Sequence, residues 1–100
     1  MATLSTSSGF ADLVGACEIV GDDCISYTSN NLGAGTVTNL GSPSGLMFRV
    51  DFPGTGNIFV IKATPNGYGG FSGTASNDEG QDEPWAAGAT AGQEAVAGRS

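Results

Sequence analysis

Residues 45–75 read GLMFRVDFPGTGNIFVIKATPNGYGGFSGTA. In the first part of this stretch, Leu46, Phe48, Val50 and Phe52 alternate with Met47, Arg49 and Asp51, and a Pro-Gly-Thr-Gly break separates them from a second apolar run. Such alternation is typical of half-buried strands, and clusters of Pro and Gly are typical of turns. A second break, Pro-Asn-Gly at residues 65–67, precedes a third and shorter run. The stretch therefore predicts three antiparallel strands joined by two turns.

The first turn determines how the first two of these strands pair. A four-residue loop at residues 53–56 places all the large apolar partners on one face. A five-residue loop would instead place Lys62 opposite Phe48 in the core, which is costly for an unpaired ammonium group. We therefore expect these pairs: Phe52 with Asn57, Val50 with Phe59, Phe48 with Ile61 and Leu46 with Ala63.

The second turn is interpreted as a type I turn followed by a glycine in the left-handed region, because residues 65–67 have the matching chemistry. Thr64 would then pair with Tyr68, and Ile61 with Phe71. The two turns together predict one shared core: Leu46, Phe48, Val50, Phe52, Phe59, Ile61 and Phe71.

The rest of the chain predicts shorter elements. We expect a strand over residues 10–20 with a bulge near Gly15, and a short helix over residues 11–16 is the alternative. Further strands are expected at residues 24–28, 36–40 and 84–87. The predicted fold class is all-β: an antiparallel meander of about six or seven short strands that forms a small barrel or a two-layer sandwich. Three parts are expected along the chain: a flexible N-terminal arm at 1–9, a single β domain at 10–87 and an Ala/Gly-rich C-terminal arm at 88–100.

Charge and composition narrow the classes of partner. The 100 residues fit one domain, and the net charge is −7, with Arg49, Lys62 and Arg99 as the three cations. A nucleic acid partner needs a basic patch, and an anionic membrane surface also favours cations, so neither partner is expected. The chain begins without the basic and apolar segments of a secretion signal. We expect a protein that is cytoplasmic or part of an assembled particle.

Histidine is absent from the chain, which removes the usual catalytic triads and dyads and most zinc sites. No catalytic residue, metal site or cofactor is predicted. A small enzyme using carboxylates remains as a third hypothesis for function, and Asp22 and Asp23 are the adjacent pair, although Gly-Asp-Asp is also ordinary turn chemistry.

Two cysteines, Cys17 and Cys24, flank a predicted three-residue turn at residues 21–23. Pairing Val20 with Cys24 leaves Cys17 about 10 Å further along its strand. A disulfide requires the two Cα atoms to lie within ~7 Å. We predict two separate core thiols, and a disulfide across a wider loop is the alternative.

Two further groups of residues can be interpreted either as structural or as functional. Asp78 and Asp82 belong to an acidic loop, which is interpreted as solvated surface or, more weakly, as a calcium site. Trp85 and Tyr68 are interpreted as core and turn residues or as the lining of a pocket for a glycan or small apolar molecule.

The predicted register also places apolar residues outside the core. Met47, Ile58 and Val60 lie on the outward face of the central strands, and apolar residues on both faces of a strand usually mean that both faces are covered. The cover is another part of the chain or a neighbouring subunit. The leading hypothesis is therefore a non-enzymatic structural, assembly or interaction subunit with a protein partner, including a second copy of itself. The alternative is a ligand-binding β-barrel.

Overall fold

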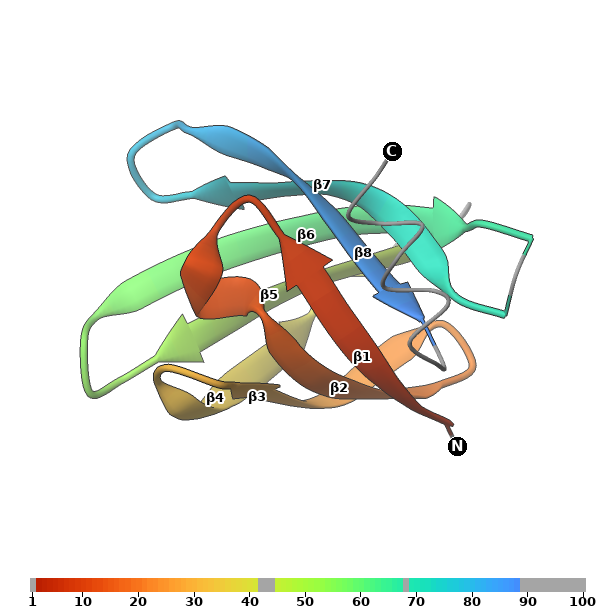
Figure 1. The fold of residues 1–100 in the computed structure, drawn as a ribbon, viewed down its shortest axis with the longest axis horizontal. Helices are drawn as coiled ribbons and strands as arrows, with labels where there is room; N and C mark the ends of the chain where they lie inside the picture. The colour runs from red at the N-terminus through yellow and green to blue at the C-terminus, as the bar shows by residue number, and fades with distance from the viewer. Residues whose placement is uncertain (1, 42–44, 68, 89–100) are drawn as a thin grey trace.

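The computed structural model describes residues 2–41, 45–67 and 69–88, and Figure 1 shows their course. These residues form eight strands and one short 3₁₀ helix, named η1. In chain order the elements are β1 (Ala2–Ser8), η1 (Ala11–Leu13), β2 (Gly15–Val20), β3 (Asp23–Ser29), β4 (Gly33–Asn39), β5 (Leu46–Phe52), β6 (Asn57–Pro65), β7 (Phe71–Asn77) and β8 (Asp82–Gly88).

The strands form a closed barrel in which each strand is antiparallel to the next along the chain. β8 returns to pair with β1, and Figure 1 shows these two strands side by side. The predicted all-β antiparallel meander is confirmed, and of the two expected architectures the protein adopts the barrel. The expected six or seven strands number eight.

The additional strand is β1. We expected a flexible arm at residues 1–9, but residues 2–6 pair with β2 on one side and residues 5–8 pair with β8 on the other. Ladder hydrogen bonds come from the backbone, so this strand forms although most of its side chains are small and polar. Leu4 and Thr6 are its buried side chains. Of the expected C-terminal arm at residues 88–100, the structure describes Gly88, which ends β8.

The first turn of the central unit has the predicted register. β5 and β6 pair Phe52 with Asn57, and every expected partner further along the two strands is in place. The carbonyl of Phe52 accepts hydrogen bonds from the N–H groups of Thr55 and Gly56, at 3.0 and 2.9 Å. Gly56 has φ +75°, a left-handed conformation that glycine adopts without strain.

The prediction for the second turn is wrong by four residues. Ile61 pairs with Ala75 rather than with Phe71, because β6 continues to Pro65 before the chain turns. The turn closes between Asn66 and Gly70, where the Asn66 N–H donates to the Gly70 carbonyl at 3.0 Å. A shift by an even number preserves the facing of side chains, so Phe71 still packs against the core, although it is only partly buried.

The two alternatives for residues 10–20 are both partly realised. Residues 11–13 form the single turn η1, and β2 follows from Gly15. The bulge lies elsewhere: Glu18 pairs with Ser26 but Ile19 pairs with Cys24, so Ile25 of β3 is the extra residue. A bulged residue leaves the ladder and changes the direction of its side chain.

Both thiols are free and buried, so the interpretation as core thiols is confirmed. They lie closer together than predicted, because Ile19 rather than Val20 is opposite Cys24. A hydrogen bond between the two thiols, together with burial, raises the pKa of Cys17. Cys17 therefore stays protonated, and unreactive, at neutral pH.

Aromatic side chains fill the barrel. Phe48 lies between Tyr27 and Trp85, with ring centroids 6.0 and 5.9 Å away. The buried hydrophobic side chains are Leu4, Leu13, Cys17, Ile19, Cys24, Tyr27, Leu46, Phe48, Val50, Phe52, Phe59, Ile61, Ala63, Ala75, Trp85 and Ala87. Six of the seven predicted core residues are in this set, and the seventh, Phe71, packs at its margin.

A small polar network crosses the core. Thr6 Oγ1 and the Tyr27 hydroxyl both donate to the carbonyl of Leu13, the first at 2.8 Å. Trp85 Nε1 donates to the Tyr27 hydroxyl oxygen at 2.9 Å. The network joins β1, η1, β3 and β8, and it provides partners for polar groups that would otherwise be costly to bury.

Gly73 is one of the positions where an added side chain would clash with the backbone of a neighbouring strand. An added Cβ would lie 2.0 Å from the Lys62 carbonyl oxygen and 2.7 Å from Ala63 Cα, both backbone atoms of β6. We expect Gly73→Ala to lower the free energy of unfolding by about 1–3 kcal/mol, as forced overpacking does. Urea denaturation followed by Trp85 fluorescence measures it. Gly54→Ala is the matched control, because a Cβ there meets nothing within 4 Å and φ is not positive. Equal losses in the two variants would contradict this account.

Candidate functional site

The outer surface of the β5–β6 hairpin carries the predicted interaction residues. We define the β5–β6 face as the outward side chains of the two strands: Met47, Arg49, Asp51, Ile58, Val60 and Lys62. Met47, Ile58 and Val60 are half-buried, whereas the alternate residues of both strands are buried in the core. The alternation that fills the barrel thus leaves a row of apolar side chains outside it.

The same face carries two cations, and one of them is paired with an acid. Arg49 and Asp51 form a two-bond ion pair, with Nε to Oδ1 at 2.7 Å and Nη2 to Oδ2 at 3.1 Å. The hydrogen bond and the charge of Asp51 raise the pKa of Arg49. Lys62 is exposed and forms no ion pair with any residue that the structure describes. Arg49 and Lys62 are two of the three cations of the chain, and the third, Arg99, lies outside the described residues.

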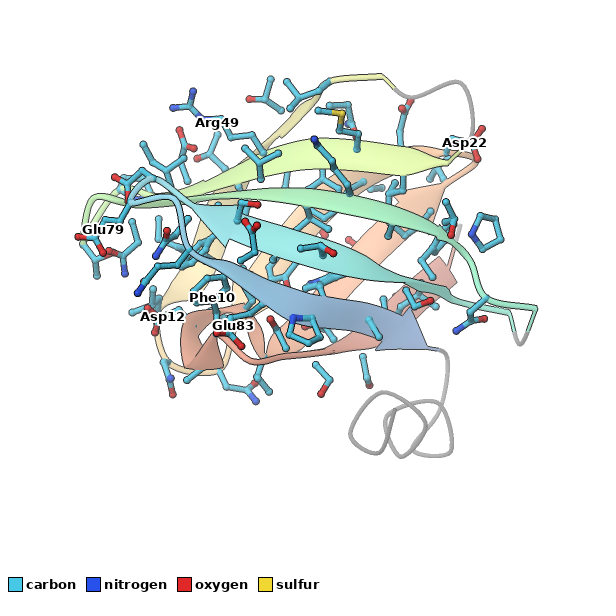
Figure 2. The ribbon with its side chains drawn as sticks, turned by 90° about the horizontal axis from the view of Figure 1, so that it is seen from above. Phe10, Asp12, Asp22, Arg49, Glu79 and Glu83 are labelled. Carbon is cyan, nitrogen blue, oxygen red and sulfur yellow. The ribbon has the colours of Figure 1, made fainter. Side chains whose placement is uncertain are left out.

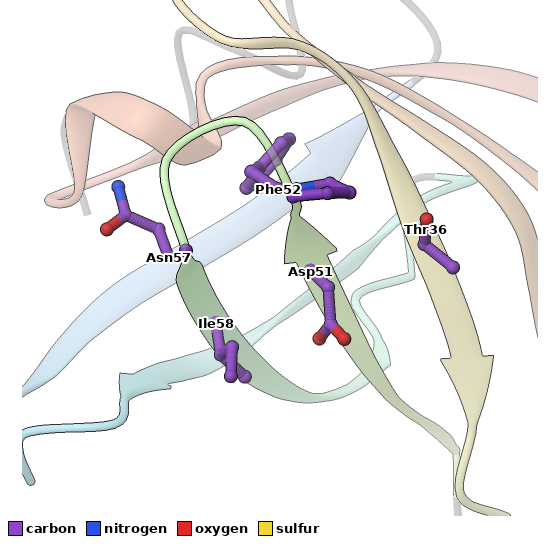
Figure 3. A pocket seen from close by; sticks show the side chains of 7 residues that line it. Thr36, Asp51, Phe52, Asn57 and Ile58 are labelled. Atoms are coloured by element: carbon purple, nitrogen blue, oxygen red, sulfur yellow. The ribbon is translucent and has the colours of Figure 1, made fainter.

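Shallow hollows flank the face. One, of about 220 Å³, lies where β5 turns into β6 and is lined by residues including Thr36, Asp51 and Ile58 (Figure 3). Another, of about 270 Å³, lies beside Met47 and Lys62 and extends toward β7. Hollows of this size accept single side chains, which suits a protein surface better than an enclosed ligand.

A second apolar surface was not predicted from the sequence. Val20, Ile25 and Leu40 are 46, 50 and 45% exposed, the large apolar side chains most open to solvent among those described. We call these three residues the β2–β4 patch, because they lie on the β2–β3 hairpin and just after β4. The bulge places Ile25 outside the barrel, and a strict alternation of sides cannot anticipate it.

The patch borders a weak seam of the barrel. β3 and β4 share three backbone pairs, Tyr27 to Ser29 with Gly33 to Gly35. Further along, the Asn39 side chain replaces the ladder: its Oδ1 accepts from Cys24 N–H at 2.9 Å and its Nδ2 donates to the Cys24 carbonyl at 2.7 Å. Ile25 therefore lies beside a stretch with no backbone pairing between the two strands.

Of the two residues proposed to line a ligand pocket, the structure describes Trp85. Trp85 is 2% exposed and bonded to Tyr27, so the interpretation as a core residue is confirmed and its ring is not open to a ligand. Tyr68 lies outside the described residues. Among the residues described, side chains of the aromatic core, rather than a ligand cavity, occupy the interior of the barrel.

The acidic residues do not converge on a metal site. Asp82 accepts a hydrogen bond from Ser76 Oγ at 2.6 Å, and Asp78 lies exposed in the turn between β7 and β8. Among the described residues there is no group of three or more His, Cys, Asp or Glu side chains that could hold a metal ion. Asp22 and Asp23 are exposed at the β2–β3 turn, and Figure 2 shows Asp22 at the opposite end of the barrel from Glu79.

A polar hollow of about 310 Å³ lies at the end of the barrel near Phe10 and Asp12. Its side chains largely satisfy one another: Asn57 Nδ2 donates to Asp12 Oδ2 at 3.0 Å, and Asn77 Nδ2 donates to Gln81 Oε1 at 2.8 Å. This arrangement ties η1 and the β7–β8 hairpin in place, and it contains no nucleophile with an adjacent base.

No family model matches the chain, and neither a curated protein nor a solved structure matches it. None of the helical residues described forms a helix long and apolar enough to cross a membrane.

Proposed function

We propose that this protein is a non-enzymatic assembly subunit whose copies associate through the β5–β6 face. The observation that carries the proposal is the row of half-buried apolar side chains, Met47, Ile58 and Val60, on the outside of a barrel whose inside is already full. Apolar side chains on the outward face of a strand usually mean that this face is covered, and exposed apolar surface can mark a protein contact.

Two further features support an assembly role over a chemical one. The chain has no histidine, and among the described carboxylates Asp12 and Asp82 accept hydrogen bonds from neighbouring side chains. The aromatic core of the barrel also favours a protein partner over a small ligand held inside. On this proposal the protein acts as part of an assembled particle.

Light scattering coupled to size-exclusion chromatography, over a wide range of concentration, tests the proposal. We expect the wild-type mass to rise with concentration and the Val60→Glu variant to remain a monomer, because a buried carboxylate opposes association. Thr28→Glu, on the exposed side of β3, is the control and should behave as the wild type does. A wild-type protein that stays monomeric throughout would overturn the proposed function.

A further inference from the structure

We propose that Asn66 is a self-modification site: in the folded protein the backbone nitrogen of Gly67 attacks the Asn66 side-chain amide, and Asn66 becomes isoaspartate or aspartate. The site lies in the turn between β6 and β7, and the inference does not depend on the proposed function. Two features of the turn carry it. They are the residue that follows Asn66 and the hydrogen bond that the Asn66 side-chain oxygen accepts.

The residue after Asn66 is the one that hinders the attack least. Of the asparagines in the chain, Asn66 alone is followed by glycine. A Cβ on the following residue would crowd the five-membered ring that the attack forms, and glycine has none. Gly67 also has φ +84°, so the turn itself favours glycine at this position. Asn66 is half-buried and Gly67 is exposed, which lets water and hydroxide reach the reacting atoms.

The turn also provides a donor for the charge that develops in the reaction. The Gly70 N–H donates to Asn66 Oδ1 at 3.2 Å, while the Asn66 N–H donates to the Gly70 carbonyl at 3.0 Å. Attack on Cγ turns Oδ1 into an oxyanion, and a backbone N–H directed at such an oxygen stabilises the transition state. The hydrogen bond that closes the turn therefore also lowers the barrier to the reaction.

The reaction needs only water and hydroxide. Hydroxide removes the proton from the Gly67 nitrogen, which bonds to Asn66 Cγ. The bond from Cγ to Nδ2 breaks, and Nδ2 takes a proton from water and leaves as ammonia. Water then opens the ring: addition at Cγ leaves aspartate on an ordinary backbone, whereas addition at the backbone carbonyl carbon leaves isoaspartate. Neither branch oxidises or reduces any atom.

Isoaspartate should loosen the end of the β6–β7 hairpin, because it lengthens the backbone by one methylene group. The two hydrogen bonds between Asn66 and Gly70 adjoin the last pair of the ladder, Pro65 with Phe71. Gly70 is buried close to β8, where an added Cβ would lie 2.1 Å from the Ala87 carbonyl oxygen. The turn therefore has little room for a longer backbone, and we expect the isoaspartate form to unfold at lower urea concentration.

Mass spectrometry of peptides from the folded protein, kept at mildly alkaline pH below its unfolding temperature, tests the inference. We expect the peptide that contains Asn66 to show loss of ammonia and gain of water, at a rate that rises in proportion to hydroxide concentration. An isoaspartate-specific methyltransferase identifies the isoaspartate product. Asn66→Gln should abolish the change, because its longer side chain no longer forms the five-membered ring.

Asn77 is the internal control, because it shares one of the two features. Its Oδ1 accepts from the N–H groups of Glu79 and Gln81, at 3.0 and 2.9 Å, but Asp78 follows it in place of glycine. In the wild type we expect Asn77 to remain unmodified while Asn66 converts. Asp78→Gly should make Asn77 convert as well, since both features are then present. Unchanged thermal unfolding shows that the fold of this variant is intact.

A parallel incubation in urea separates the folded turn from the bare sequence. We expect Asn66 to convert at least as fast in the folded protein as in the unfolded chain, because only the folded turn places the Gly70 N–H on Oδ1. Conversion in urea alone would mean that the turn protects Asn66, and it would overturn the inference. Equal rates at Asn66 and Asn77 in the folded wild type would overturn it too, since the glycine would then have no role.

Discussion

Replacement of Phe48 by alanine should lower the free energy of unfolding by about 3–5 kcal/mol, the cost usual for deleting a fully buried phenylalanine. Phe48 is 0% exposed and its ring lies against those of Tyr27 and Trp85, the second in an edge-on arrangement at 5.9 Å. Deletion removes these contacts and leaves a cavity in the middle of the barrel. Urea denaturation, monitored by the fluorescence of Trp85, measures the loss.

Phe71→Ala is the matched control for this prediction. The same ring is deleted there, but Phe71 lies at the margin of the core and is only partly buried. A smaller loss is expected, because the site is already in contact with water and can relax. If Phe48→Ala cost no more than Phe71→Ala, the centre of the core would not lie where the structure places it.

The stability of the protein should also fall steeply in alkali. Burial raises the pKa of Tyr27 above its ordinary value near 10, and the hydrogen bonds of its hydroxyl only partly oppose this. Below pH ~10 the side chain is protonated in both states. Above that pH the unfolded chain loses the proton while the folded chain keeps it. The free energy of unfolding then falls by up to about 1.4 kcal/mol per pH unit until the folded pKa is reached.

Tyr27→Phe isolates this effect. At neutral pH the variant should lose about 1–3 kcal/mol, because Trp85 Nε1 is left without its acceptor and Leu13 loses one donor. Above pH ~10 its stability should fall less steeply than that of the wild type, by the contribution of one proton. Cys17 shifts in the same direction, so a parallel Cys17→Ala variant separates the thiol from the phenol. Identical alkaline slopes for the wild type and Tyr27→Phe would contradict the assignment.

The central hairpin shows what a single sequence can predict. Its register follows from one argument, that a charged Lys62 is not buried opposite Phe48, and the structure has that register throughout. The penalty for a one-residue slip is large, since it would invert every side chain of the strand. The proposed interaction residues Met47, Ile58 and Val60 are on the outward face for the same reason.

The second hairpin shows where this reasoning ends. A slip of four residues keeps Phe71 on the same side of the sheet. The predicted register therefore buries no additional polar side chain, and the alternation of sides cannot distinguish it from the true one. Close packing between β6 and β7 selects the register instead. β7 approaches β6 so nearly at Gly73 that only glycine fits, and the turn closes on the hydrogen bond between Asn66 and Gly70.

The all-β class, the pairing of β5 with β6 and the outward position of Met47, Ile58 and Val60 could be predicted from the sequence alone, and a core position was the favoured interpretation for Trp85 and both cysteines. These depend on local alternation and on the high cost of burying charge, which short stretches of sequence contain. The closure of the barrel by β1 and the bulge at Ile25 became apparent only in the folded protein. Backbone hydrogen bonds and the closure of the last ladder set these features. They involve strands far apart in the chain and leave no pattern in the side chains.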